Sequence, residues 1–79
     1  MTNLTLPVNS GDYIRIENRH KSEPTSLKTA SGLEFIRILP GEYALFCAGS
    51  VPIIAEGSEF RYKVAPTNKI GRVRWSIVH

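Results

Sequence analysis

The chain has 79 residues, of which 10 are Lys or Arg and 7 are Asp or Glu, so its formal net charge at pH 7 is +3. This length suffices for one small domain and excludes the long alternation of strands and helices that a nucleotide-binding α/β enzyme needs. A composition of 42% hydrophobic and 22% charged residues is ordinary for a globular domain, and no apolar run approaches the roughly 20 residues of a membrane span. We therefore expect a single domain over residues 1–79 and no membrane partner.

The N-terminus and the lone cysteine indicate the cellular compartment. Residues 1–13 lack both the basic start and the long apolar stretch of a secretory signal, so we expect the chain to stay in a reducing compartment. The single Cys47 excludes an intrachain disulfide. Because Cys47 falls in an apolar segment, its expected state is a buried, inert thiol.

Apolar segments alternate with turn residues about every ten positions, and this spacing is typical of an antiparallel β-sandwich or small barrel. Five prolines and six glycines leave few windows long enough for a stable helix. We predict an all-β domain of about seven strands, at residues 2–7, 12–18, 33–39, 42–48, 51–56, 59–65 and 71–78.

The clearest turn is the sequence Leu-Pro-Gly-Glu at residues 39–42. Proline presets φ at the first turn position and glycine accepts the positive φ that follows, so this turn is expected to join strands 33–39 and 42–48 as a hairpin. Residues 18–31 are polar and carry no period, which predicts one long loop. A short extended piece around residues 25–27 could pair with a sheet edge.

Two of the predicted strands, 33–39 and 51–56, carry apolar residues on both faces, through Phe35-Ile36 and Ile53-Ile54. A strand of this kind is either central in its sheet or covered by another chain.

The last two predicted strands do alternate, and this alternation assigns their faces. The inward residues are Phe60, Tyr62, Val64, Val73, Trp75 and Ile77. The outward residues are Arg61, Lys63, Arg72 and Arg74, with Lys69 in the connecting loop. Residues 60–79 therefore hold five basic and no acidic side chains, which are expected to form one basic face.

This basic face could bind nucleic-acid phosphates or an acidic protein surface, or it could serve only solubility and edge protection. A nucleic-acid platform places aromatic side chains among its cations. Here Phe60, Tyr62 and Trp75 are assigned to the opposite face, which argues against nucleic acid. Tyr43 is expected to be exposed and completes the candidate partner-binding residues.

Residues for catalysis or metal binding are few. His20 lies in the polar loop, His79 is the last residue, and neither stands at metal-ligand spacing from Cys47. Motifs for phosphate-binding loops, zinc proteases and serine hydrolases are absent from the sequence. We expect no catalytic residue, no metal and no cofactor.

Three segments, at residues 32–46, 51–55 and 73–78, carry a resemblance to a known class of proteins. Their order is a strand, a Pro-Gly-Glu turn, an apolar strand, a short strand ending in alanine and a terminal strand with an aromatic residue. This order resembles small β-sandwich proteins of tailed-phage virions, among them capsid decoration proteins and tail or adaptor accessory proteins. The resemblance covers about residues 32–79 and implies a non-enzymatic role, self-association around a symmetry axis and binding to a larger protein shell.

The expected function is accordingly that of a virion structural or accessory protein, above all a capsid-associated decoration or cement protein made in the host cytoplasm. Its expected partners are further copies of itself and a larger viral shell or tail protein, with no small-molecule substrate. The first alternative is a nucleic-acid-binding β-barrel that uses the basic C-terminal hairpin. A small inhibitor or regulator that acts through the loop at 18–32 is the second alternative, and an enzyme is the third.

Overall fold

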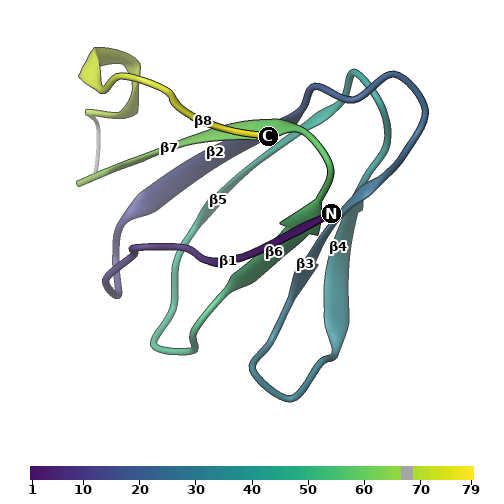
Figure 1. Cartoon of the computed structure of the whole chain (residues 1–79). Helices are drawn as coiled ribbons and strands as arrows, with labels where there is room; N and C mark the ends of the chain where they lie inside the picture. Colours follow the sequence, from purple (N-terminus) through teal and green to yellow (C-terminus); the bar gives the residue numbers. More distant parts are fainter. Residues whose placement is uncertain (67–68) are drawn as a thin grey trace.

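A computed structural model describes residues 1–66 and 69–79, and in this part of the chain eight strands form two four-stranded antiparallel sheets (Figure 1). The strands are β1 (Thr2–Thr5), β2 (Tyr13–Asn18), β3 (Thr25–Lys28), β4 (Glu34–Ile38), β5 (Tyr43–Cys47), β6 (Ile54–Gly57), β7 (Phe60–Ala65) and β8 (Ser76–Val78). A single turn of 3-10 helix, η1 (Ile70–Arg72), precedes β8. This architecture confirms the expected small antiparallel β-sandwich.

The first sheet has the order β1-β6-β3-β4 and the second has the order β5-β2-β7-β8. Their facing sides form the core, in which Ile14, Ile16, Leu27 and Phe60 are completely buried. Strand β2 shows how the pattern works, because its buried residues alternate with half-exposed ones along its length. Full burial of one such side chain contributes about 1.5–3 kcal/mol to folding.

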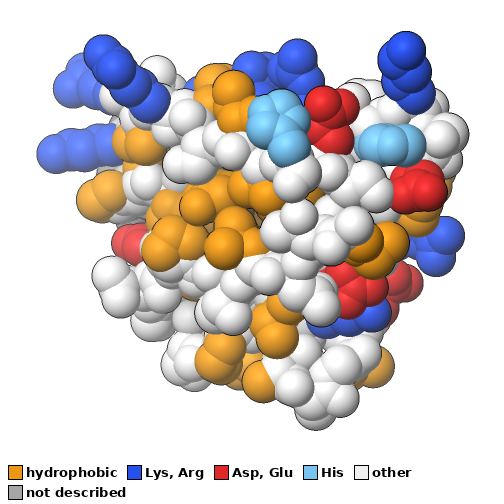
Figure 2. All heavy atoms as spheres, in the orientation of Figure 1, with side chains coloured by type: hydrophobic (Ala, Val, Ile, Leu, Met, Phe, Trp, Pro, Cys, Tyr) orange, Lys and Arg blue, Asp and Glu red, His pale blue; other side chains and the backbone are white. Residues whose placement is uncertain are grey.

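On one side of the sandwich, Oγ1 of Thr2 in β1 donates to the carbonyl of His79 after β8 at 3.1 Å, and Figure 2 shows hydrophobic side chains at the surface near these strands. The half-buried Leu4 of β1 and Val78 of β8 pack against the core. The opposite side is bordered by β4 and β5, the other edge strands of the two sheets.

The prediction of one long loop at residues 18–31 is wrong, because this segment contains β3. The extended piece expected around residues 25–27 is confirmed, but it pairs in the middle of its sheet instead of at an edge. Strand β3 lies between β6 and β4, and its residues Thr25 and Leu27 are completely buried. The sequence signal is weak because one leucine supplies the apolar character of a four-residue strand. Burial of a threonine is not predicted by hydrophobic periodicity.

The turn at residues 39–42 is confirmed, but the hairpin is wrong. Gly41 has a φ of +80°, and the N–H of Glu42 donates to the carbonyl of Leu39 at 2.9 Å. The turn nevertheless connects two different sheets, since β4 belongs to the first and β5 to the second. Local turn chemistry fixes the reversal of the chain, while the sheet that each arm joins depends on long-range pairing.

Asn18 explains how the turn is held across the sandwich. Its main chain accepts from the N–H of Gly41 at 3.1 Å and donates to the carbonyl of Glu42 at 3.0 Å. Its buried side-chain amide donates to the carbonyls of Ile38 and Glu23 at 2.9 and 2.7 Å. Asn18 thus attaches the end of β4 and the turn to β2 of the opposite sheet.

The predicted strand at 71–78 is correct only for its second half. Residues 70–72 form η1, and strand pairing with β7 is limited to 76–78. Ile77 lies opposite Arg61 and is 63% exposed, whereas Val78 packs on the core. Ile77 therefore points outward, whereas alternation predicted it to point inward, because the helical turn interrupts the alternation.

Of the two strands with apolar residues on both faces, β6 is central, between β1 and β3, as one reading of its pattern predicted. Strand β4 is an edge strand, and its Phe35 is 43% exposed. The second reading, coverage by another chain, remains a prediction for β4.

Candidate interaction surfaces

The outer side of the second sheet gathers cations and aromatic rings, and we call this surface the cation–aromatic face. It consists of Arg15 and Glu17 from β2, Tyr43 from β5, Arg61 and Lys63 from β7, and Trp75 from the segment before β8. The strand residues share this face because each lies opposite another in the register: Arg15 pairs with Lys63, and Glu17 pairs with both Tyr43 and Arg61.

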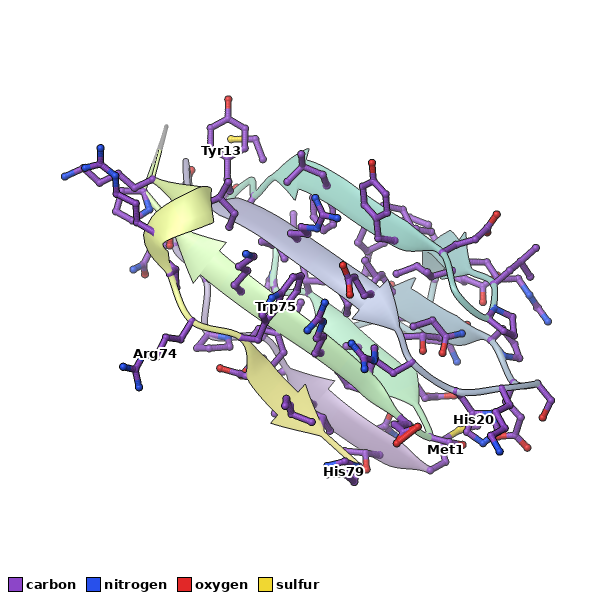
Figure 3. The ribbon with its side chains drawn as sticks, turned by 90° about the horizontal axis from the view of Figure 1, so that it is seen from above. Met1, Tyr13, His20, Arg74, Trp75 and His79 are labelled. Atoms are coloured by element: carbon purple, nitrogen blue, oxygen red, sulfur yellow. The ribbon has the colours of Figure 1, made fainter. Side chains whose placement is uncertain are left out.

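Trp75 lies over β7 at the centre of this face (Figure 3). The Cζ atom of Arg61 is 3.9 Å and the Nζ atom of Lys63 is 4.2 Å from the centroid of its ring. On the other side, the Cζ of Arg15 is 4.1 Å from the ring centroid of Tyr43. Cations at these distances are attracted by the negative faces of the rings, so the two aromatic residues and the three cations form one connected surface.

Glu17 organises the cations of this face. Its Oε2 accepts from Nε of Arg61 at 2.7 Å, and its Oε1 accepts from a terminal nitrogen of Arg15 at 3.3 Å. The hydrogen bond from Arg61, together with the charges of both guanidinium groups, lowers the pKa of Glu17 below its usual 4.5, although partial burial opposes this shift. Glu17 therefore stays ionised and fixes both arginines, while three cations against one carboxylate leave the face basic.

The prediction that Trp75 belongs to the core is wrong. Trp75 is half-buried on the outside of the sheet, against the same arginine and lysine from which alternation had separated it. The reason is the same as for Ile77. The chain forms the helical turn η1 at residues 70–72, so the alternation of inward and outward side chains in β7 cannot be continued to Trp75. Phe60 and Tyr62 do point inward, as expected.

Three of the six candidate partner-binding residues lie on the cation–aromatic face, and the other three do not. Arg61, Lys63 and Tyr43 lie on the cation–aromatic face. Arg72 is the last residue of η1 and Lys69 directly precedes this helical turn. Figure 2 shows Lys and Arg side chains gathered at this corner of the molecule. Arg74 points away from Trp75 in Figure 3. The expected single basic face is therefore wrong for Arg72 and Arg74.

Sequence reasoning missed Arg15, Glu17 and Trp75 as members of this face. The first two could have been found, because they alternate with the buried Ile14 and Ile16 in one strand. Placing them beside Arg61 required the pairing of β2 with β7, which local sequence does not contain.

A second surface is apolar, and we call it the apolar edge. It lies on β4, β5 and the loops that flank them, where six large hydrophobic side chains are 43–66% exposed. These residues are Leu33, Phe35, Leu39, Tyr43, Leu45 and Val51. Tyr43 belongs to both surfaces, since β5 is the strand at which they meet.

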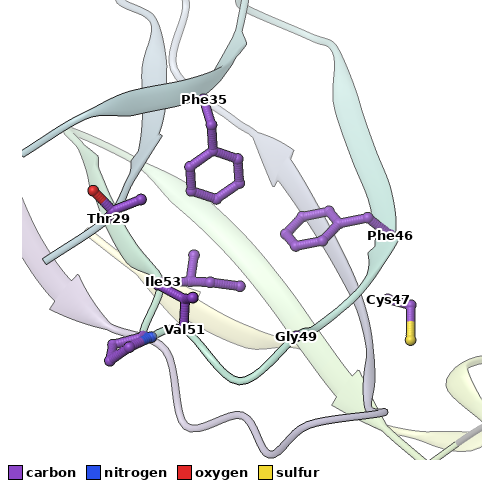
Figure 4. Close-up of a pocket in the computed structure, with 8 residues that line it drawn as sticks. Thr29, Phe35, Phe46, Cys47, Gly49, Val51 and Ile53 are labelled. Atoms are coloured by element: carbon purple, nitrogen blue, oxygen red, sulfur yellow. The ribbon is translucent and has the colours of Figure 1, made fainter.

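A cleft opens beside the apolar edge, between the two sheets (Figure 4). The rings of Phe35 and Phe46 meet edge to face at its mouth, with centroids 6.3 Å apart and planes at 89°. The cleft has a volume of about 300 Å³, and its other lining residues are Thr29, Cys47, Gly49, Val51, Pro52 and Ile53. This lining suits an inserted apolar side chain, because it carries no charge and the thiol of Cys47 points away from the cleft in Figure 4.

The groups that would serve catalysis or metal binding are separated. Across residues 1–66 and 69–79 there is no group of three or more His, Cys, Asp or Glu side chains that could hold a metal ion. Nδ1 of His20 accepts hydrogen bonds from the main-chain N–H groups of Ser22 and Glu23. Cys47 is exposed, so the expectation of a buried thiol is wrong: it alternates with Phe46 and lies outward on an edge strand.

The chain matches no protein-family model, and no curated protein sequence or solved structure is significantly similar to it. Among the described residues no helix is long and apolar enough to cross a membrane.

Proposed function

We propose that this chain is a virion structural or accessory protein, and specifically a capsid-associated decoration protein that acts by binding rather than by catalysis. The observation that carries the proposal is the part of the apolar edge beside the uncharged cleft, where Leu33, Phe35 and Val51 are 43–66% exposed. The resemblance of residues 32–79 to small β-sandwich virion proteins supplies the class of partner, a viral protein shell.

The exposed apolar side chains of this edge stay in contact with water, which costs free energy. Contiguous apolar surface on a small soluble domain is typical of a protein interface. The cleft between Phe35 and Phe46 would receive one apolar side chain of the partner, and the exposed Leu33 and Val51 would pack around it. A single contact of this size is modest, but many copies on one shell stabilise it together.

The test is co-sedimentation of the purified chain with empty shells assembled from the major capsid protein of the genome that encodes it. The expected result is saturable binding that Val51→Glu weakens at least tenfold. Ile77→Glu is the matched control, because Ile77 is 63% exposed at the opposite edge of its sheet and should bind as the wild type does. Equal binding by both variants, or an encoding genome without a capsid gene, would contradict the proposal.

Nucleic acid is a second candidate partner, favoured by the cation–aromatic face. Tyr43 and Trp75 lie on the same side of the sheet as Arg15, Arg61 and Lys63, which is the interleaving of rings and cations that single-stranded nucleic acid requires. Tyr43 is 57% exposed and so has surface available for a base.

A filter-binding titration with single-stranded oligonucleotides over a range of salt concentrations tests this second candidate. If the face binds phosphates, log K falls steeply with log[salt], and Lys63→Ala reduces that slope by about 0.7. Tyr43→Ala should weaken binding while leaving the slope unchanged. Arg37→Ala on the exposed side of β4 is the control. A flat salt response would remove nucleic acid as a candidate and leave the shell proposal unaffected.

A further inference from the structure

We propose that β5 is a self-pairing edge, through which two copies of this chain form a dimer with one continuous eight-stranded sheet. The proposal does not depend on the virion function. Strand β5 reads Tyr-Ala-Leu-Phe-Cys and contains no charge, no proline and no glycine. Among the described residues it pairs only with β2, so its other side presents unpaired main-chain groups. An uncharged, regular edge of this kind is a template for another strand.

The three other sheet edges carry features that discourage such pairing. Strand β4 holds Glu34 and Arg37, and its register with β3 is irregular between Leu27 and Lys28. Strand β1 is four residues long and polar, and β8 is three residues long. Charges, bulges and short length are the usual protections of an edge, so β5 is the edge left without one.

The hydrogen bonds between β5 and β2 show which groups of β5 face outward. The N–H of Ala48 donates to the carbonyl of Asp12 at 2.7 Å, and the carbonyl of Glu42 accepts from the N–H of Asn18 at 3.0 Å. Bonded pairs alternate along an antiparallel ladder, so the main chain of Ala44 and Phe46 also faces β2. The N–H and C=O groups of the intervening residues, Tyr43, Leu45 and Cys47, point to the open side.

This arrangement selects one symmetric register. A two-fold axis beside Leu45 places Leu45 opposite Leu45 of the second copy. Tyr43 of each copy then lies opposite Cys47 of the other. In this register each outward residue exchanges two hydrogen bonds with its opposite. With an axis beside Ala44 or Phe46, one of these three residues in each chain would have no hydrogen-bonded partner in the second copy.

The side chains are compatible with this register. Leu45 is 51% exposed and would cover its own counterpart on the outer face, with no like charges brought together. On the inner face, Phe46 would lie beside Ala44 of the second copy. The clefts next to Phe35 and Phe46 of the two chains would then adjoin. Self-complementary chemistry of this kind identifies the occupant as a second copy of this chain.

Tyr43→Cys tests both the dimer and its register. Facing residues of a bonded antiparallel pair are about 5.5 Å apart between Cα atoms, a separation that a disulfide spans. Mild oxidation should therefore convert the Tyr43→Cys protein to a covalent dimer that runs at twice the monomer mass on a non-reducing gel. Within one chain, residues 43 and 47 are about 13 Å apart along the strand, so they cannot join to each other.

The matched control is the double variant Tyr43→Cys/Cys47→Ser. In this variant the new cysteine faces a serine hydroxyl, not a thiol, at position 47 of the second copy. It should therefore give less than a tenth of the cross-linked product of Tyr43→Cys. Cross-linking by random collision would instead be equal in the two variants. In sedimentation, the wild type should be a dimer, Leu45→Lys a monomer and Val51→Lys a dimer. A monomeric wild type at millimolar concentration, or equal cross-linking of the double variant, would overturn the proposal.

Discussion

The ring of Trp75 lies against the guanidinium group of Arg61, with 3.9 Å between the ring centroid and Cζ, and this contact fastens the segment before β8 to the outer side of its sheet. Lys63 adds a second cation at 4.2 Å. The short strand β8 has three residues, so this contact adds to its limited pairing with β7.

Trp75→Ala should therefore release the C-terminal segment. We expect the free energy of unfolding to fall by about 1–3 kcal/mol, since the substitution removes cation–π contacts and half-buried ring surface. Hydrogen exchange should accelerate in β8 before it does in β2. Trp75→Phe, which keeps a ring, should recover part of the loss. Unchanged exchange in β8 would show that the contact has no structural effect.

Glu17→Gln should remove an acid-sensitive part of the stability. Because the folded pKa of Glu17 lies below its usual 4.5, ionised Glu17 stabilises the fold above about pH 4.5, and this contribution is lost as the pH falls through the folded pKa. At pH 7 we expect the variant to be less stable by about 1–2 kcal/mol.

Urea denaturation of the wild type and Glu17→Gln from pH 7 to pH 2.5 measures this difference. The two curves should converge at low pH, where Glu17 is protonated. A constant gap between the curves over the whole range would contradict the assignment.

Asn18→Ala should be among the most destabilising single substitutions. Asn18 is 1% exposed, and its amide satisfies the carbonyls of Glu23 and Ile38, which would lose their partner. The expected loss is about 2–4 kcal/mol, from unsatisfied buried acceptors and the cavity left behind. Asn9→Ala, on an exposed turn, should change the free energy of unfolding by less than about 0.5 kcal/mol. Similar thermal midpoints for the two variants would show that Asn18 does not hold the turn.

Gly57→Ala should destabilise the fold because Thr25 occupies the space that a Cβ atom would need. An ideal Cβ at position 57 lies 2.6 Å from Oγ1 and 3.2 Å from Cγ2 of Thr25. Overpacking of this kind costs about 1–3 kcal/mol. Thr25→Ala removes both atoms, so the double variant should lose less than the sum of the two single variants.

A double-mutant cycle by chemical denaturation measures this coupling between positions 25 and 57. Gly49→Ala is the control, because no atom lies within 4 Å of its ideal Cβ, and it should be neutral or slightly stabilising. Additive losses in the cycle would mean that the strand shifts instead of clashing.

The sequence determined the all-β class, the seven strands that correspond to β1, β2 and β4–β8, and the reversal at residues 39–42. These features are local: alternation with period two and the backbone preferences of proline and glycine act within a few residues. The same locality explains why β3 was predicted only as a short extended piece at a sheet edge, since its central position and the burial of Thr25 depend on the strands at its sides.

The tertiary structure alone decided which sheet each strand joins and which side chains meet on one face. It places β4 and β5 in different sheets although only the turn at residues 39–42 connects them. It also brings Trp75 against Arg61 and places Arg15 beside Tyr43. Inward and outward side chains alternate regularly only inside an unbroken strand, and the helical turn η1 interrupts this alternation before Trp75. Pairing between strands far apart in the chain is set by the burial of the whole core, and no short segment of the sequence contains that information.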